Sequence, residues 1–348
     1  MWTAGMVGRT VATIAAIGLV ALPTVAAAQN RGRGGPAPVG DVVGAGNFIH
    51  VVGDLDRTVA FYTTLLGVKP NGDATNRPYA ANQPVATMYN TPGSKFRGAT
   101  FKVPNSDLGL EFIEWEGNRS PAVKARVFDP GAPVIVLQVR SIEAGIEAVK
   151  QHGGSFVTPN GEPVRFSSER FSPRRLMIVR DPDGYFVELI NPDQSPEAPE
   201  PGNVLGATFR YTAVDANRAA RFFGTAFGFK VAEAGDFTDD PVLGKMMALG
   251  TVLQRFAGST VPGSTLGLQF AEYDKLEGKK VEQGLPRPGT SMLRLMVRDL
   301  DASLAKARAA GATVAPGNDP PVTLGNGRRM AVVVSPDGLL LQLAEAAK

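Results

Sequence analysis

NFIHVVGDLDRTVAFYTTLLG, residues 47–67, decides the fold because its pattern returns three more times along the chain. In each copy a hydrophobic strand leads to a polar helix cap, then to an amphipathic helix, and then to a glycine. The other copies begin at Ala132, Thr208 and Ser291. An internal repeat of this kind predicts four copies of one supersecondary unit.

Each copy is followed by a further strand of one shape: LGLEFIEW from Leu108, YFVELINP from Tyr185, LGLQFAEY from Leu266 and LLLQLAEA from Leu339. Side chains that can accept hydrogen bonds from the first free N–H groups precede the four helices: Asp54, Ser141, Asp215 and Asp299. We therefore expect an α+β fold of tandem βαβββ modules. The helix of each module packs on one face of a curved antiparallel sheet, and the other face is concave.

A proline-rich, acidic stretch divides the chain into two halves of similar sequence. Residues 193–202 lie within it and are the predicted linker. VPNSDLGLEF from Val103 matches VPGSTLGLQF from Val261, which indicates a tandem duplication. The predicted domains are residues 41–192 and 203–346, each a pair of modules that forms its own cup.

Composition excludes several classes of protein. The 348 residues include 36 Lys and Arg against 33 Asp and Glu, and the basic excess is spread along the chain, so we expect no nucleic-acid partner. The chain has no Cys, which excludes disulfides, thiolate metal sites and Cys nucleophiles. With two His residues, no Ser/His/Asp triad is credible.

The first 28 residues are typical of a secretory signal peptide. Arg9 is their single charge, an apolar stretch follows, and three alanines that end at Ala28 supply small residues for cleavage. An uncleaved membrane anchor is the alternative, but the apolar stretch is short for a span and contains Pro23. Residues 29–40 are a predicted flexible leader. The mature protein is therefore expected in the periplasm or outside the cell, and not in the membrane.

In these motifs the chain resembles the vicinal oxygen chelate superfamily, which includes glyoxalases, bleomycin-resistance proteins and extradiol dioxygenases. The resemblance is carried by Asp54-Leu55-Asp56-Arg57, Phe61-Tyr62, Asp181-Pro182-Asp183-Gly184 and Glu188-Leu189, with a weaker counterpart at Ser335-Pro336-Asp337-Gly338. It covers nearly all of the mature chain and implies that two modules pair to form one cupped sheet. The reaction stays open, because one fold hosts many functions.

Metal-binding members of that superfamily place ligands in the first and last strands of each module, in sites that suit Fe(II), Mn(II), Zn(II) or Ni(II). In the first half the resemblance places these positions at Asn47, Glu111, Val134 and Glu188. In the second half it places them at Thr208, Gln269, Met292 and Gln342. The second half therefore has no ionisable ligand, whereas the first half keeps two carboxylates.

Glu111 and Glu188 are the candidate catalytic residues and the candidate metal ligands, and we expect them to lie across one cup. Three interpretations stay open. The pair holds one divalent ion (Mn, Fe, Ni, Zn or Mg) with Asn47 and water. Alternatively, one carboxyl group has a raised pKa and acts as a general base without metal. In the third interpretation the pair is vestigial, and no cofactor is bound.

Arg210 and Arg294 share a strand face with the ligand positions of the second half, because alternate residues of a strand point to the same side. Two guanidinium groups in one cup would bind a carboxylate or phosphate, so an anionic ligand is one prediction. Pairing with acids across the domain interface is the alternative. The candidate ligand-binding residues are Asn47, Arg210, Arg294, Gln269 and Gln342.

His50 lies in the first strand but, by alternation from Asn47, is expected to face the helix layer rather than the cup. Its counterpart in the second half is Tyr211, which indicates a packed, hydrogen-bonded position. A bulge would reverse the face, so His50 stays an outside candidate for a metal ligand.

Three functions are compatible with this sequence. The first is a secreted or periplasmic protein that binds a small organic molecule in a cupped sheet without a full metal site, as bleomycin-resistance proteins do. The second is a metal-dependent lyase, isomerase or dioxygenase with its site in the first domain. The third is a protein-interaction module. One chain already contains two cups, so a monomer is compatible with all three.

Overall fold

The four predicted modules are present in the computed structural model, which describes residues 41–72, 77–168 and 172–347. The predicted signal peptide (1–28) and leader (29–40) lie outside the described residues. Within the described part of the chain, no helix is both long enough and apolar enough to span a membrane.

Each module has a first strand, a long helix and further strands. Module 1 consists of β1 (Val42–Val51), α1 (Leu55–Leu66), β2 (Ala80–Ala81), α2 (Gln83–Met88), β3 (Lys95–Lys102) and β4 (Gly109–Trp115). Module 2 consists of β5 (Pro133–Val139), α3 (Glu143–His152), β6 (Ser155–Phe156), the short 3-10 helix η2 (Pro159–Gly161), β7 (Val164–Phe166), β8 (Arg174–Arg180) and β9 (Phe186–Pro192). Module 3 consists of β10 (Val204–Thr212), α4 (Ala216–Phe227), β11 (Thr238–Asp239), α5 (Pro241–Met246), β12 (Leu253–Thr260) and β13 (Gly267–Asp274). Module 4 consists of β14 (Ser291–Val297), α6 (Leu300–Ala309), β15 (Thr313–Val314), β16 (Val322–Thr323), β17 (Arg329–Val334) and β18 (Leu340–Glu345).

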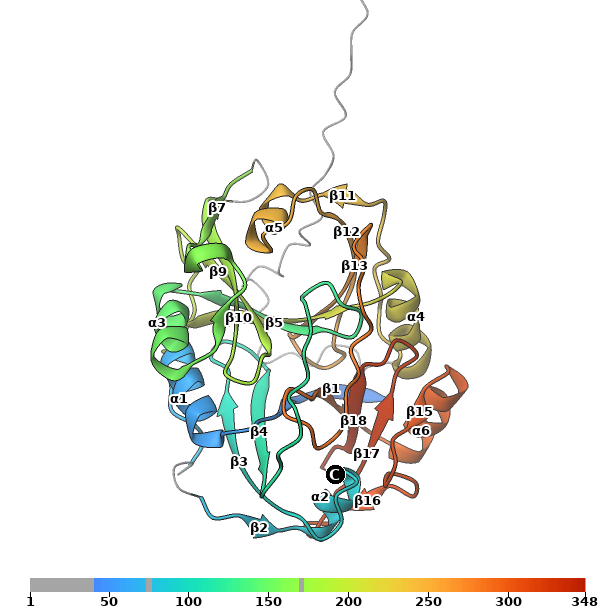
Figure 1. Cartoon of the computed structure of the whole chain (residues 1–348). Helices are drawn as coiled ribbons and strands as arrows, with labels where there is room; N and C mark the ends of the chain where they lie inside the picture. The colour runs from blue at the N-terminus through green and yellow to red at the C-terminus, as the bar shows by residue number, and fades with distance from the viewer. Residues whose placement is uncertain (1–40, 73–76, 169–171, 348) are drawn as a thin grey trace, which may run out of the picture.

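The strands form two sheets (Figure 1). Sheet A has the order β15-β17-β18-β14-β1-β4-β3-β2, with β16 paired to β17. Sheet B has the order β11-β12-β13-β10-β5-β9-β8-β6, with β7 paired to β8. Modules 1 and 4 therefore share sheet A, and modules 2 and 3 share sheet B.

The predicted α+β fold of tandem, paired modules is confirmed, but two expectations are wrong. The sheets are mixed rather than antiparallel, because the first strand of each module pairs in parallel with the last strand of the same module. Modules 1 and 2 are expected in one cup, whereas β1 pairs with β14 and β5 pairs with β10, both antiparallel. The first strands of all four modules have similar hydrophobic patterns, and such a pattern determines which face is buried rather than which strand is the neighbour. Each sheet therefore draws strands from both predicted domains.

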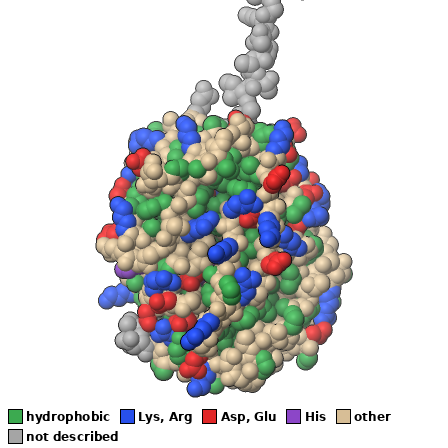
Figure 2. All heavy atoms as spheres, in the orientation of Figure 1, with side chains coloured by type: hydrophobic (Ala, Val, Ile, Leu, Met, Phe, Trp, Pro, Cys, Tyr) green, Lys and Arg blue, Asp and Glu red, His purple; other side chains and the backbone are tan. Residues whose placement is uncertain are grey.

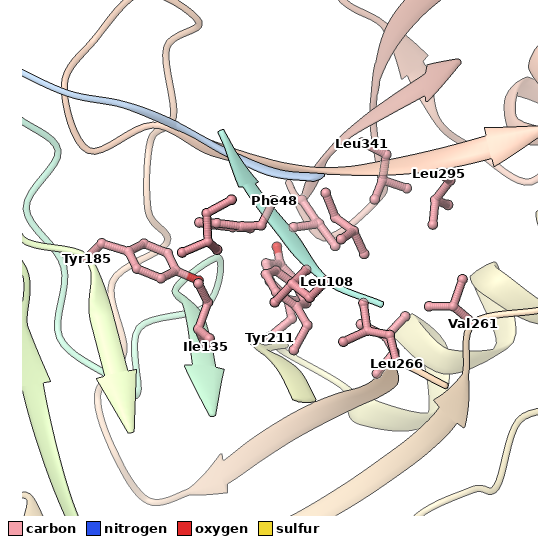
Figure 3. Close-up of a cluster of buried hydrophobic side chains, with 14 of the residues drawn as sticks. Phe48, Leu108, Ile135, Tyr185, Tyr211, Val261, Leu266, Leu295 and Leu341 are labelled. Carbon is pink, nitrogen blue, oxygen red and sulfur yellow. The ribbon is translucent and has the colours of Figure 1, made fainter. Parts of the chain in front are cut away.

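The long helices join the modules in the other combination. α1 packs against α3 and α4 packs against α6, so helices connect module 1 to module 2 and module 3 to module 4. The buried core is continuous across all four modules, as Phe48, Ile135, Tyr211 and Leu295 show (Figure 3). The modules thus form a closed ring in which strand pairing alternates with helix packing.

Three of the four predicted helix caps are confirmed. Asp54, Asp215 and Asp299 each accept a hydrogen bond from the backbone N–H three residues further on. Ser141 does not cap α3, which begins after Ile142 without a side-chain cap hydrogen bond. The Ser141 hydroxyl donates to the Glu143 carboxylate instead.

We call the face of each sheet that is turned away from the long helices cup A in sheet A and cup B in sheet B. A short helix packs on each of these faces. α2 contacts cup A through Ala86 and Met88, and α5 contacts cup B through Leu243 and Met246. Both cups are therefore mostly apolar, and their polar side chains are few enough to be considered one by one.

Candidate ligand site

Both cups contain the same three kinds of polar side chain. Cup A has Glu111 on β4, Arg294 on β14 and Gln342 on β18. Cup B has Glu188 on β9, Arg210 on β10 and Gln269 on β13. In each cup the glutamate comes from the first predicted domain, and the arginine and glutamine come from directly paired positions of the second.

In cup B the arginine and the glutamate form a bidentate ion pair. Arg210 Nη1 donates to Glu188 Oε2 at 2.6 Å, Nη2 donates to Oε1 at 3.4 Å, and Nε donates to Gln269 Oε1 at 3.3 Å. The Arg210 and Glu188 side chains are only 8% and 5% exposed. Burial lowers the pKa of Arg210, but the Glu188 carboxylate outweighs that effect and the pKa is raised overall. This pair holds the two modules together and leaves little hydrogen-bonding capacity for a ligand.

A second buried carboxylate lies near the cup B pair. Asp240 caps α5 by accepting hydrogen bonds from the N–H groups of Val242 and Leu243, and its other oxygen accepts one from Gln254. Burial raises the pKa of Asp240, and the neighbouring Glu188 carboxylate also raises it. Asp240 is not among the site residues predicted from the sequence, because a residue that caps a six-residue helix has no strong periodic signal after it.

In cup A the corresponding pair is partly exposed and partly unused. Arg294 Nη1 lies 2.9 Å from Glu111 Oε2, and the two side chains are 13% and 22% exposed. Asn47 Nδ2 donates to the same carboxylate oxygen at 2.8 Å, and Arg294 Nε donates to Gln342 Oε1 at 2.5 Å. Among the described residues, Glu111 Oε1 and Arg294 Nη2 have no hydrogen-bond partner. The pair therefore keeps one acceptor and one donor for another molecule.

A β-bulge in β1 places Arg294 differently from Arg210. The pairing of β1 with β14 shifts by one residue, so that Gly46 and Asn47 lie opposite Arg294 alone. The Arg294 side chain crosses Gly46 so closely that a Cβ there would lie 2.7 Å from Arg294 Cγ. In sheet B the pairing around Arg210 is unbroken, and Arg210 lies opposite Val134. The bulge is thus the local difference between the two cups.

Aromatic residues form one wall of cup A. The rings of Tyr89 and Phe96 each lie 5.2 Å from the ring of Trp115. Burial raises the pKa of Tyr89, and the Glu111 carboxylate raises it further, so the phenol is protonated at neutral pH. The Tyr89 hydroxyl and the Trp115 indole N–H have no hydrogen-bond partner in the described part of the chain. Cup B also has unpartnered atoms of this kind, so the ion pairs rather than these groups distinguish the cups.

Two geometric expectations from the sequence are wrong. Glu111 and Glu188 do not lie across one cup, because β4 belongs to sheet A and β9 belongs to sheet B. Arg210 and Arg294 likewise lie in different cups, and each is paired with a glutamate from the other predicted domain. Because the two guanidinium groups do not share a cup, they do not predict an anionic ligand. The alternative, ion pairs between the two predicted domains, is confirmed.

His50 faces the helix layer, as strand alternation predicts. It is fully buried, and its Nε2 lies 3.2 Å from Asp181 Oδ2. The Tyr62 hydroxyl donates to the same carboxylate oxygen at 3.1 Å. Burial lowers the pKa of His50, but the Asp181 carboxylate, with smaller contributions from Asp183 and the Thr290 carbonyl, outweighs burial and raises it overall. This set is closed to solvent and is structural rather than a ligand site.

The second half of the chain replaces this titratable set with neutral groups. The equivalents of His50, Tyr62 and Asp181 are Tyr211, Phe223 and Ser335. The Tyr211 hydroxyl donates to the backbone carbonyl of Asp337 at 2.9 Å. Asp181 and Tyr62 are not predicted from the sequence as partners of His50. A position-by-position comparison of the two halves is the signal that finds them.

Two known protein families match this chain. Residues 46–189 match the family described as the Glyoxalase/Bleomycin resistance protein/Dioxygenase superfamily, and residues 207–344 match the glyoxalase-like domain. The chain belongs to this superfamily. The two matches together include all four modules, so the resemblance drawn from the sequence motifs is confirmed.

Similar members of the superfamily include lactoylglutathione lyases. The chain is 27% identical over 199 residues to that enzyme from Arabidopsis thaliana, a match that covers 53% of this chain and 55% of the plant protein. It is 27% identical over 164 residues to the enzyme from Salmonella typhimurium, which covers 44% of this chain and 93% of the bacterial protein. The chain thus spans about half the length of the plant relative.

Glyoxalase I from Zea mays is a solved structure with a similar fold. It superposes with a TM-score of 0.56 over 88% of this chain and 92% of that chain, at 19% sequence identity. At this identity the similarity shows the fold alone.

The superfamily resemblance implies a divalent metal ion, but the residues in either cup do not fit one. The implied ligand positions in cup A are Asn47, Glu111, Met292 and Gln342. The implied positions in cup B are Val134, Glu188, Thr208 and Gln269. Each set has a single carboxylate, which is already paired with an arginine that would repel a cation. Within the described ranges, no group of three or more His, Cys, Asp or Glu side chains is placed to hold a metal ion.

Proposed function

We propose that this superfamily member binds a small organic molecule in cup A, and that it does so without a metal ion. The observation that carries the proposal is the Arg294–Glu111 pair, which is partly exposed and has an unused donor and an unused acceptor. The corresponding Arg210–Glu188 pair of cup B is buried and bidentate. Cup B is therefore assigned a structural role.

Each polar residue of cup A has a definite part in this proposal. Arg294 donates to the ligand and Glu111 accepts from it. Asn47 and Gln342 orient these two groups, because they hydrogen-bond to Glu111 Oε2 and Arg294 Nε. Hydrogen bonds to charged groups contribute about 1.5–3 kcal/mol each, and the buried Ile49 lies beside Glu111 on the neighbouring strand β1.

The proposal is tested by screening a fragment library with ligand-observed NMR against the wild type and Arg294→Met. Arg221→Gln is the matched control, because Arg221 also pairs with a glutamate but is 54% exposed on the surface. We expect fragments that bind the wild type and Arg221→Gln, and lose binding to Arg294→Met. Fragments that bind Arg294→Met equally well would place the ligand elsewhere and contradict the proposal.

A metal-dependent lyase, isomerase or dioxygenase is the second candidate, and the names of the relatives favour it. It requires that a carboxylate exchange its arginine for a metal ion. Metal analysis of protein purified without a His tag, compared with Glu111→Gln/Glu188→Gln, separates the two candidates. A tightly held divalent ion that is lost in the double variant, together with lyase activity that is lost on chelation, would replace our proposal.

The proposed export of the mature protein rests on the composition of residues 1–28. Fractionation of cells that express the full chain should place a shortened protein outside the cytoplasm. Recovery of the uncleaved chain from the cytoplasm would contradict this part of the proposal.

The surface composition supports a small ligand rather than a polyanion. On the face shown in Figure 2, basic side chains are interspersed with acidic and apolar ones. Nucleic-acid binding depends on a basic surface that neutralises many phosphates at once, and a mixed surface of this kind does not provide one.

A further inference from the structure

The unused atoms of cup A indicate the charge of the ligand. This inference rests on the proposed function. Arg294 Nη2 is an unused donor and Glu111 Oε1 is an unused acceptor, and both belong to one ion pair whose charges balance. Both side chains are mostly buried. A ligand that contacts them must therefore leave the charge balance of a poorly solvated pair intact.

Ligands with a single charge disturb this balance. An anion would compete with Glu111 for Arg294 and would leave the carboxylate without its cation. A cation would do the same to Arg294. A buried charge that loses its partner is strongly unfavourable. A net-neutral head group that offers a donor to Glu111 and an acceptor to Arg294 uses both free atoms while the pair stays together.

The apolar neighbours of the pair limit where a ligand can approach. Ile49 and Met292 belong to the same apolar cluster as Tyr89 and Trp115. These four side chains are at most 3% exposed. A ligand therefore reaches the pair from its solvent-exposed side.

We propose that cup A selects net-neutral molecules whose head group carries a hydrogen-bond donor and an acceptor together, with a primary carboxamide as the simplest case. Cup B is not a second copy of this site. Both oxygens of Glu188 already accept from Arg210, so this pair has no carboxylate oxygen without a hydrogen bond.

Three probes with the same ring test this selectivity. Benzamide is net neutral and has both a donor and an acceptor, benzoate is an anion, and benzylammonium is a cation. Dissociation constants are measured by ligand-observed NMR titration of the full mature chain at neutral pH. We expect benzamide to bind about tenfold more tightly than either charged probe, the ratio that one extra charged hydrogen bond provides.

The possible outcomes separate this inference from the proposed function. If benzoate or benzylammonium binds as tightly as benzamide, the inference is wrong while cup A still binds a small molecule. If no probe binds, the inference is also wrong, and the fragment screen on Arg294→Met decides the proposed function by itself.

Substitutions in the pair should invert the preference rather than merely weaken binding. Glu111→Gln frees the guanidinium and should shift the preference about tenfold toward benzoate. Arg294→Met frees the carboxylate and should shift it toward benzylammonium. Glu233→Gln, in the exposed Arg221–Glu233 pair, is the control and should keep the wild-type order. If Glu111→Gln and Arg294→Met both keep the benzamide preference, this pair does not contact the head group and the inference is overturned.

Discussion

Cup A and cup B contain the same arginine, glutamate and glutamine, yet the ion pair in cup A is monodentate and that in cup B is bidentate. In cup B the guanidinium meets both carboxylate oxygens and is almost fully buried. In cup A one guanidinium nitrogen meets one oxygen, and both side chains are reached by solvent. Residue identity at equivalent positions therefore does not determine function here. The completeness of the hydrogen bonding and the access of solvent separate a structural pair from a binding pair.

The bulge in β1 explains how one set of residues has two outcomes. Arg294 faces two residues of β1, and its side chain passes over Gly46, which has no Cβ. Arg210 faces Val134 in an unbroken pairing. A bulge changes the direction of nearby side chains, and here it turns the arginine of cup A away from a fully paired arrangement with its glutamate.

The largest difference in stability between the two cups is expected when the arginine of each pair is removed. Arg210→Met leaves the Glu188 charge buried without a partner, so we expect the free energy of unfolding to fall by about 3–5 kcal/mol. Arg294→Met leaves a carboxylate that is 22% exposed and still accepts from Asn47, so we expect a smaller loss of about 1–3 kcal/mol. Urea denaturation monitored by circular dichroism measures both. Equal losses would mean that the two pairs have the same role and would contradict the distinction between the cups.

A methyl group at Gly46 tests the role of the bulge. Gly46→Ala places a Cβ between 2.7 and 2.9 Å from three carbons of Arg294, so the side chain must move. We expect a loss of about 1–3 kcal/mol in stability, which is typical of overpacking, and weaker benzamide binding. Gly206→Ala is the control, because a Cβ at Gly206, in β10 of sheet B, has no neighbour within 4 Å. Unchanged benzamide affinity in Gly46→Ala would show that the placement of Arg294 does not matter.

The titration of His50 in the helix layer should make the stability of the protein depend on pH above 6.5. The pKa of His50 is raised in the folded protein from 6.5. Its interaction with Asp181 therefore contributes fully below the unfolded pKa and is lost as the pH rises through the folded pKa. We expect wild-type stability to decline as the pH rises above 6.5. The variant His50→Tyr/Tyr62→Phe/Asp181→Ser, which copies the second half, should have a flatter profile in urea denaturation at several pH values. An unchanged slope in this variant would place the titrating group elsewhere.

The smallest expected effect is that of metal removal. Since the implied ligand positions of each cup include one carboxylate and both carboxylates are paired with an arginine, dialysis against a chelator should leave the melting temperature and benzamide affinity unchanged. Thermal unfolding and NMR titration before and after dialysis measure this. A drop in melting temperature that Mn²⁺ or Zn²⁺ reverses would favour the metal-dependent enzyme.

The sequence is sufficient to predict the modules, three of the four helix caps and the inward direction of Glu111 and Arg294, because these depend on local pattern and strand alternation. It also predicts that His50 faces the helices. It does not predict that β1 pairs with β14, because strand pairing over long sequence separation depends on the whole ring of modules. The bulge opposite Arg294 is equally invisible, since a bulge is a property of two strands and not of one.

Methionine methyl NMR with benzamide tests most directly whether cup A alone is the ligand site. Met88 and Met292 belong to the apolar cluster of cup A, whereas Met246 and Met247 belong to that of cup B, so each cup has its own reporters. The account predicts that benzamide shifts the methyl resonances of Met88 and Met292 and leaves those of Met246 and Met247 in place. Shifts confined to Met246 and Met247, or of equal size in both cups, would contradict it.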